Sequence, residues 1–164
     1  ASRGLGDVYK RQIYLEYKNF DLTMFWQGVQ GVDVISDLKK ETDLWSGLNI
    51  GFLNKGKRVL DAWTPTNPDS DIPALSRDDV NNEKRVSTYF VENGSFLKLR
   101  NLQIGYNVPQ NFAKKMKMER LRLYLSAQNL LTIKSKEFTG VDPENPNYGY
   151  PIPLNLTFGI NVSF

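Results

Sequence analysis

The last eleven residues of the chain alternate strictly between apolar and polar side chains. From Leu154 to Phe164, every even position is apolar and every odd position is polar or glycine. A repeat of two places successive side chains on opposite faces of an extended strand, so this segment predicts a strand with one apolar and one polar face. At about 3.3 Å per residue it would span roughly 36 Å, or about 25 Å across a bilayer when tilted near 45°. That length suits a membrane strand, because strands of soluble sheets usually hold about five or six residues.

The same alternation recurs earlier in the chain and predicts an all-β fold, an antiparallel meander of about five long strands. The expected strands cover residues 13–18, 20–35, 96–108, 121–132 and 154–164. A two-residue turn at Lys18-Asn19 would pair Tyr17 with Phe20 and point both side chains to one face. The apolar phase changes after Leu99, so we expect a β-bulge near Arg100.

The connections between these segments differ sharply in length. Lys18-Asn19 and residues 109–120 are short, whereas 36–95 and 133–153 are long polar stretches rich in Pro, Asn, Asp and Ser. Short turns at one end of the strands and long loops at the other are typical of outer-membrane β-barrels. In that frame the basic cluster Lys114, Lys115, Lys117 and Arg120 is interpreted as a solvated turn at the short-turn end.

Composition excludes several classes of function. The chain holds no cysteine and no histidine, which removes disulfides, thiolate metal sites and catalysis by Ser-His-Asp or Cys-His groups. We therefore expect no enzyme activity, no cofactor and no metal site. No run of about eighteen apolar residues occurs, so no transmembrane helix is expected. The mean hydropathy of −0.45 does not separate a soluble protein from a barrel, whose alternating strands average out as hydrophilic.

Residues 1–12 are interpreted as a translated sequencing adapter. Asp7 to Gln12 can be encoded by GAT GTG TAT AAG AGA CAG, the mosaic end of transposase-based libraries, and Ser2 to Gly6 fit the adapter arm upstream. The segment holds three basic and one acidic side chains, so removing it leaves 18 basic and 17 acidic ones out of 21 and 18. The basic isoelectric point is then no argument for a nucleic-acid partner. Residues 13–164 would form the remaining domain.

Six stretches in the same order resemble the C-terminal region of SusC/RagA transporters, which are TonB-dependent outer-membrane proteins. Together they cover most of residues 13–164. They are Trp63-Thr64-Pro65-Thr66-Asn67-Pro68 with Ile72-Pro73, Asn93 to Leu102 running into Ile104 to Pro109, Leu123 to Leu131, Gly140-Val141-Asp142-Pro143-Glu144, Tyr150-Pro151, and Phe158 to Phe164.

This resemblance implies a fold and a function. Transporters of this class are 22-stranded barrels with a plugged lumen, so the chain would supply about five strands. The signal sequence, TonB box, plug and remaining strands would lie upstream. The resemblance implies energy-coupled import of oligosaccharides or peptides across the outer membrane of a Gram-negative bacterium. Its implied partners are a SusD-like surface lipoprotein, the TonB complex through the missing part, and outer-membrane lipid.

A few side chains are candidates for specific roles. Trp45 and Trp63 would stack on sugar rings from a long loop, or else Trp63 anchors the packing of that loop. Asp142 and Glu144 form a carboxylate pair that could contact a ligand or a partner, although a solvated turn is the favoured explanation. Phe164 resembles the terminal aromatic residue by which barrel-assembly machinery recognises its clients. Residues Tyr17, Phe20, Tyr106 and Phe164 would form an aromatic girdle at the lipid interface.

Two other functions remain open on the sequence. A soluble β-sandwich that binds carbohydrate would bury the apolar phase of its strands, whereas a barrel exposes it. A passive porin would share the barrel but need no plug.

Overall fold

The computed structural model describes residues 6–44, 54–76, 82, 85–146 and 149–164. The chain folds into two compact units. The sheet unit comprises Ala1–Val32, Ser95–Ser135 and Ile152–Phe164, and the loop unit comprises Asp33–Gly94 and Lys136–Pro151. The loop unit is therefore built from the two long polar connections that the sequence predicts.

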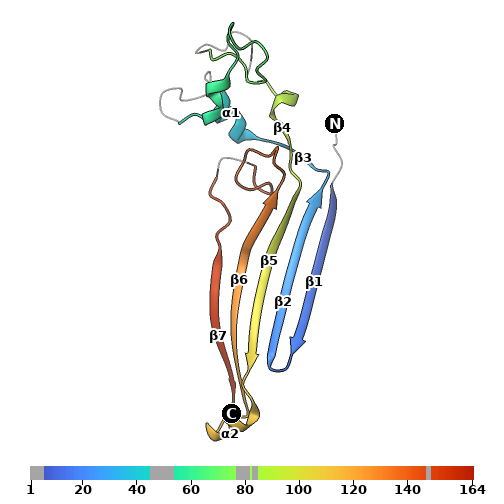
Figure 1. Cartoon of the computed structure of the whole chain (residues 1–164), viewed down its shortest axis with the longest axis vertical. Coiled ribbons are helices and arrows are strands. Elements are labelled where there is room, and N and C mark those ends of the chain that lie inside the picture. Colours follow the sequence, from blue (N-terminus) through green and yellow to red (C-terminus); the bar gives the residue numbers. More distant parts are fainter. Residues whose placement is uncertain (1–5, 45–53, 77–81, 83–84, 147–148) are drawn as a thin grey trace. The chain divides into compact units, whose positions relative to one another are not determined.

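The sheet unit is one antiparallel sheet of five strands in the order β1-β2-β5-β6-β7 (Figure 1). The strands are β1 (Asp7–Tyr17), β2 (Phe20–Gln30), β5 (Phe96–Asn107), β6 (Arg120–Lys134) and β7 (Asn155–Ser163). Within this sheet each strand pairs with its neighbour along the chain. The predicted all-β meander of five strands is confirmed.

The predicted turn and bulge are also present. Tyr17 pairs with Phe20, and Lys18 adopts the left-handed conformation, φ 54°, that such a tight turn requires. Against β2, the register of β5 shifts between Leu99 and Asn101, where the extra residue Arg100 keeps the apolar side chains on one face. Opposite this bulge, Asn129 of β6 adopts the left-handed conformation, with a φ of 56°.

The apolar phase of the sheet is exposed. On β7, Leu156 and Phe158 are each 65% exposed, Ile160 55% and Val162 39%. Every residue of β1 is exposed as well. Among the described residues, no second sheet covers these apolar side chains, which contradicts the soluble β-sandwich, where they would be buried.

The second strand ends earlier than the sequence suggests. A single strand over 20–35 was expected, but β2 stops at Gln30 and β3 (Asp33–Ile35) pairs with β4 (Val91–Asn93) in a separate two-stranded sheet. The chain turns at Gly31, whose φ of 72° is strained for other residues and whose amide donates to Ser95 Oγ at 3.0 Å. Alternation alone does not report such a break.

A short helix, α2 (Gln110–Lys115), connects β5 to β6. Pro109 precedes it and removes a donor that a strand would need. The backbone amide of Val108 donates to the Leu121 carbonyl at 2.9 Å, and the backbone amide of Glu119 donates to the Ser163 carbonyl at 2.8 Å. The connection is thus tied to the ends of β6 and β7, and Figure 1 shows the C-terminus beside it.

The loop unit has its own small core and regular elements. Helix α1 (Asp37–Asp43) begins at Ser36, whose side chain accepts from the Lys39 amide, and the 3-10 helices η1 (Lys57–Asp61) and η2 (Thr88–Phe90) follow. Its most buried apolar side chains are Leu44, Val59, Ala62, Phe90 and Phe138. Among the described residues, no helix is long and apolar enough to cross a membrane.

Residues 7–12 extend β1 and pair with Phe25–Gln30 while every side chain stays exposed. An accidental strand extension of this kind is compatible with the adapter interpretation, which stays a prediction.

Candidate functional site

The polar face of the sheet carries an ion pair that joins two strands that are not neighbours. Arg122 on β6 donates to both carboxylate oxygens of Asp21 on β2, with Nη2–Oδ2 at 2.6 Å and Nε–Oδ1 at 3.2 Å. Asn107 on β5 adds a third donor at 3.4 Å. Asp21 is 5% exposed, so its charge is desolvated and needs these donors.

Two glycines make this arrangement possible. The ion pair passes over Gly105 of β5, where a Cβ would overlap both Asp21 and Arg122. A Cβ at Gly159 of β7 would overlap the ring of Tyr124. The register places Asp21, Gly105, Tyr124 and Gly159 in one row across four strands. Large side chains in this row lie flat against the backbone of the next strand, so the polar face has low relief there.

A second polar group lies at the bulge. Arg100 donates to Gln27 Oε1 at 3.2 Å and to Asn129 Oδ1 at 3.4 Å. Ser126 donates to Asn101 at 3.1 Å. These contacts bind β2, β5 and β6 together through side chains as well as through the backbone ladder. The polar face is therefore a cross-linked, hydrogen-bonding surface with fixed charges.

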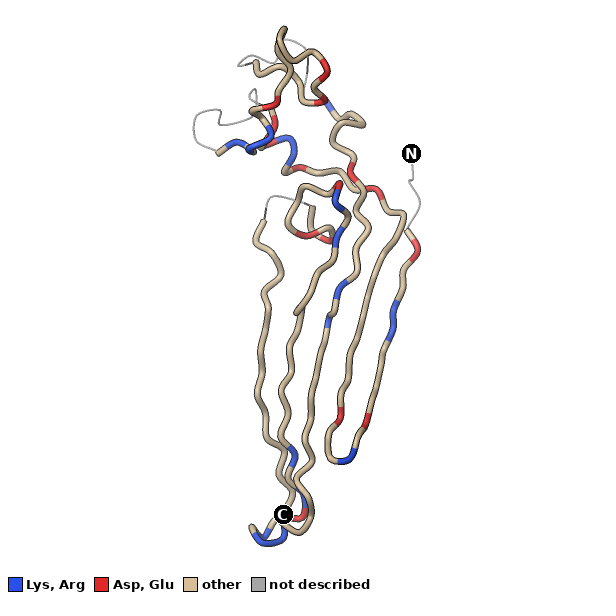
Figure 2. The backbone as a smooth tube through the Cα atoms, in the orientation of Figure 1, with Lys and Arg blue, Asp and Glu red and all other residues tan. Residues whose placement is uncertain are grey.

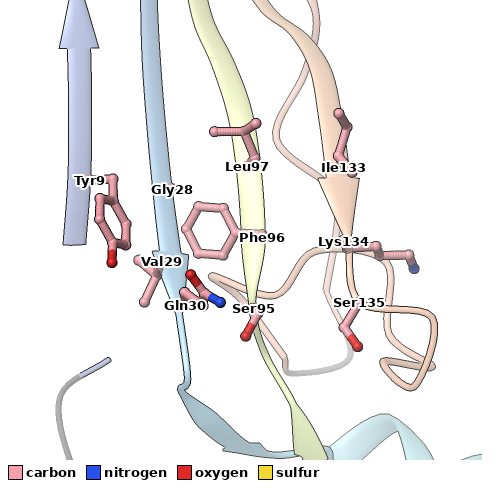
Figure 3. Close-up of a pocket in the computed structure, with 10 residues that line it drawn as sticks. All are labelled: Tyr9, Gly28, Val29, Gln30, Ser95, Phe96, Leu97, Ile133, Lys134 and Ser135. Carbon is pink, nitrogen blue, oxygen red and sulfur yellow. The ribbon is translucent and has the colours of Figure 1, made fainter. Parts of the chain in front are cut away.

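An apolar groove of about 430 Å³ opens at the other end of the sheet (Figure 3). Gly28 leaves the space, and Tyr9, Phe96, Leu97 and Ile133 line it. One wall is Tyr9, which belongs to the segment that resembles an adapter. The groove is for that reason not a candidate binding site.

In the loop unit, a network of charged side chains holds the segments together. Arg58 donates through Nε to Asp43 Oδ1 at 2.7 Å, and its Nη2 pairs with Asp43 Oδ2. The Tyr89 hydroxyl donates to Asp43 Oδ2 at 2.7 Å. Lys39 Nζ donates to the Tyr89 carbonyl at 2.5 Å and lies 4.1 Å from the centre of its ring. The last link is Glu92, 3.9 Å from Lys39 Nζ.

Glu92 also connects the two long connections of the chain. It accepts hydrogen bonds from the Thr139 amide at 3.0 Å and from the Thr139 hydroxyl at 2.8 Å, and it is 6% exposed. Because Thr139 lies in the second long connection, this one carboxylate fixes it to β4 of the first.

Burial shifts the titration of this network. It lowers the pKa of the Lys39 ammonium, and the nearby Arg58 guanidinium lowers it further. Burial also raises the pKa of the Tyr89 phenol, and its hydrogen bond to Asp43 adds to the shift. The hydrogen bond to Asp43 raises the pKa of Arg58. Burial and the hydrogen bond to Asp43 thus both favour the neutral form of the Tyr89 phenol over the phenolate.

The loop residues singled out from the sequence lie in ordered turns. Trp63 is 42% exposed and its amide donates to the Ile72 carbonyl at 2.9 Å. Asp142 is buried and accepts the Glu144 amide at 3.0 Å, which is the geometry of an Asx-turn. Glu144 itself is exposed. Trp45 lies outside the described residues.

Asp142 and Glu144 are not brought together with further ligands. No group of three or more acidic side chains that could hold a metal ion occurs in the described part of the chain. Phe164 is 86% exposed beside the end of β7. Of the expected girdle, Tyr17 is 70% and Phe20 54% exposed, and the Phe20 ring packs against Tyr106 at a tilt of 43°, with ring centres 4.7 Å apart.

The ion pair of Asp21 with Arg122 and the Glu92 link were not predicted from the sequence. Both join residues far apart in the chain, 101 positions in the first case and 47 in the second. A faint signal existed for the first, because Gly105 interrupts a strand at a polar position and so indicates that something crosses it closely.

Comparison with known proteins agrees with this architecture. No protein-family model matches the chain. It is 36% identical over 166 residues to TonB-dependent receptor P3 of Formosa agariphila, covering 92% of this chain and 15% of that protein. It is 35% identical over 168 residues to TonB-dependent receptor P26 of the same organism, covering 92% and 16%.

Solved structures give the same result. The chain superimposes on the RagAB peptide transporter with a TM-score of 0.72 and 32% identity, over 91% of this chain and 16% of that one. For the RagAB peptide importer in its closed-closed state the TM-score is 0.74 and the identity 30%, over 94% and 17%. The chain belongs to the SusC/RagA family of TonB-dependent receptors.

TonB-dependent receptors are outer-membrane β-barrel proteins, and the five-stranded sheet of this SusC/RagA chain matches part of such a barrel. The chain spans 15–16% of the length of the TonB-dependent receptors described above. The exposed apolar face of β7 and the polar face with Asp21 and Arg122 are what one wall of a barrel requires.

Proposed function

We propose that this chain is the C-terminal wall segment of an energy-coupled importer in the outer membrane of a Gram-negative bacterium. The observation that carries the proposal is the division of one sheet into two faces. The apolar face is exposed along β1 and β7, where a bilayer would cover it. The polar face, with its ion pair across Gly105, would line the lumen of a 22-stranded barrel.

The transported molecule is an oligosaccharide or a peptide. The RagAB relatives are peptide transporters, which supports the peptide, and the resemblance to SusC supports the glycan. A SusD-like lipoprotein would cover the loop unit, and the TonB complex would act through parts outside this chain. The protein has no catalytic role in this proposal.

Specific side chains would serve this function. Trp63 offers an exposed ring at the surface of the loop unit, suited to a sugar or an apolar peptide side chain. Glu144 would contact substrate or the lipoprotein, while the buried Asp142 fixes its turn. Phe164, exposed at the C-terminus, would be recognised by the barrel-assembly machinery.

The test uses the complete receptor gene that contains this segment. Its product should be recovered from outer-membrane fractions as a heat-modifiable barrel. Uptake of labelled oligopeptides or oligosaccharides should require the receptor, and uptake should stop when TonB is removed. Uptake that continues without TonB would indicate a passive porin instead.

Loop residues are tested in the same cells. Trp63→Ala should weaken uptake while leaving the amount of receptor unchanged, and Leu60→Ala serves as its matched control because Leu60 is 83% exposed in the same unit. Phe164→Ala should instead lower the amount of assembled barrel.

A further inference from the structure

The positive charge of this chain is concentrated in one short connection. Residues 110–120 hold four basic side chains and one acidic one, whereas the rest of residues 13–164 holds 14 basic and 16 acidic ones. Figure 2 shows these basic residues gathered at the α2 turn. Within the described part of the chain, none of the four forms an ion pair. Their charges are available to a partner.

Helix α2 has one buried residue and two exposed sides of different character. Ala113, within the sheet unit, is fully buried. Phe112 is 61% and Met116 57% exposed, and Lys115 Nζ lies 5.7 Å from the centre of the Phe112 ring. At about 100° per residue, Phe112, Lys115 and Met116 share one side of the helix. Exposed apolar side chains next to a cation form an amphipathic surface, not a uniformly solvated turn.

The other side of α2 is polar. Gln110 and Lys114 lie about 160° or more from Phe112 by the same geometry. They line an open cleft of about 350 Å³ with Glu119, Arg120 and Ser163. Arg120 and Ser163 belong to the polar phase of β6 and β7, because they lie two positions from Arg122 and Asn161. The cleft thus continues the polar face, and the Phe112 side lies away from it.

The position of α2 along the strands matches the depth of lipid headgroups. Tyr106, of the aromatic girdle, precedes Gln110 by four residues, which is at most about 9 Å along the membrane normal for a strand tilted near 45°. The headgroup layer extends about 5–7 Å beyond the hydrocarbon on each side. The long aliphatic part of a lysine side chain lets its ammonium group reach the headgroup layer across the remaining distance.

We propose that the Phe112 side of α2 is an interfacial anchor that binds anionic phospholipid in the leaflet at the short-turn end. Phe112 and Met116, both more than half exposed, enter the boundary of the acyl chains. Lys115 contacts lipid phosphate. This inference rests on the proposed membrane location of the sheet, and it replaces the solvated turn that the sequence alone indicates.

The neighbouring lysines give a matched comparison. Lys115 lies on the anchor side, whereas Lys114 lines the polar cleft. A cation next to an anionic leaflet strengthens binding by about fivefold. Lys115→Gln should therefore lower the retention of phosphatidylglycerol, relative to phosphatidylcholine, by about fivefold on the complete receptor in mixed micelles. Lys114→Gln should change it less than twofold, and native mass spectrometry would count the retained lipids.

Depth is measured independently with nitroxide labels on the complete receptor in phosphatidylethanolamine–phosphatidylglycerol nanodiscs. This segment contains no cysteine, so Phe112→Cys, Gln110→Cys and Phe158→Cys place single labels once any cysteine elsewhere is replaced. Labels at Phe112 and Phe158 should collide with oxygen more than with a water-soluble nickel chelate. The label at Gln110 should show the reverse.

Each other outcome has a distinct meaning. If Phe158 reports lipid and Phe112 reports water, the anchor is wrong and the membrane barrel stands. If both report water, the proposed function itself fails. If the Phe112 label is shielded from both reagents, α2 contacts protein, and the lipid proposal is overturned. Equal loss of phosphatidylglycerol in Lys114→Gln and Lys115→Gln would also overturn it.

Discussion

Replacing Arg122 with glutamine tests whether the ion pair over Gly105 holds the polar face together. Asp21, whose side chain is 6% exposed beside Arg122, would keep only the donor from Asn107, at 3.4 Å. Exposed pairs contribute about 0.2–1 kcal/mol, and breaking a buried pair costs about 3–5 kcal/mol. The Arg122 side chain is 24% exposed, between these limits, so we expect a loss of about 2 kcal/mol.

The loss should be local, so the assay is hydrogen–deuterium exchange on the complete receptor in detergent. Peptides from β5 and β6 around Gly105 should exchange about thirtyfold faster in Arg122→Gln, since about 1.4 kcal/mol corresponds to a factor of ten. Asp21→Asn alone should give a similar increase. The double variant should exchange more slowly than the product of the two single effects predicts, because neither charge is then left without its partner.

Two results would refute this reasoning. If the single effects simply multiply in the double variant, Asp21 and Arg122 do not stabilise one another. If exchange changes only in β1, the pair does not act where the structure places it. Gly105→Ala is a second probe, because its Cβ would displace the pair and should accelerate exchange in the same peptides.

Four further outcomes follow from the same structure. Glu92→Gln should speed proteolysis of the second long connection in the complete receptor by removing the charged acceptor in the loop unit, whereas Glu144→Gln, at an exposed position, should not. The Tyr89 phenol, whose pKa is raised, should ionise only above the pH at which an ordinary tyrosine does. The ultraviolet difference spectrum against Tyr89→Phe would detect this ionisation. The contribution of the neutral phenol to stability is full below the unfolded pKa near 10 and is lost as pH rises through the folded pKa. Resequencing the gene with another library chemistry should replace the codons of residues 1–12, and finding them unchanged would disprove the adapter. Residues 13–164 expressed alone should aggregate in buffer without detergent, because the sheet exposes two edges and an apolar face, and a monodisperse monomer with a sharp thermal transition would contradict that.

Local pattern accounts for what the sequence predicted correctly. The strict alternation before Phe164 determines which side chains share a face, since a strand has a repeat of two. The Lys18-Asn19 turn sets the register of the first hairpin, and the phase change at Arg100 locates the bulge. These features depend on neighbours in sequence, so they are readable without a tertiary structure.

Partners distant in the chain were decided only by the fold. Arg122 meets Asp21 because three strands come into register and Gly105 leaves the space between them. Glu92 meets Thr139 because two long connections pack together. At the break after β2, the Gly31 amide donates a hydrogen bond to Ser95 Oγ, which is distant in the chain. By itself the sequence determined the strands and their two faces, because side-chain alternation is local. Only the tertiary structure decided which charges meet, because burial and pairing depend on residues that the chain brings together from afar.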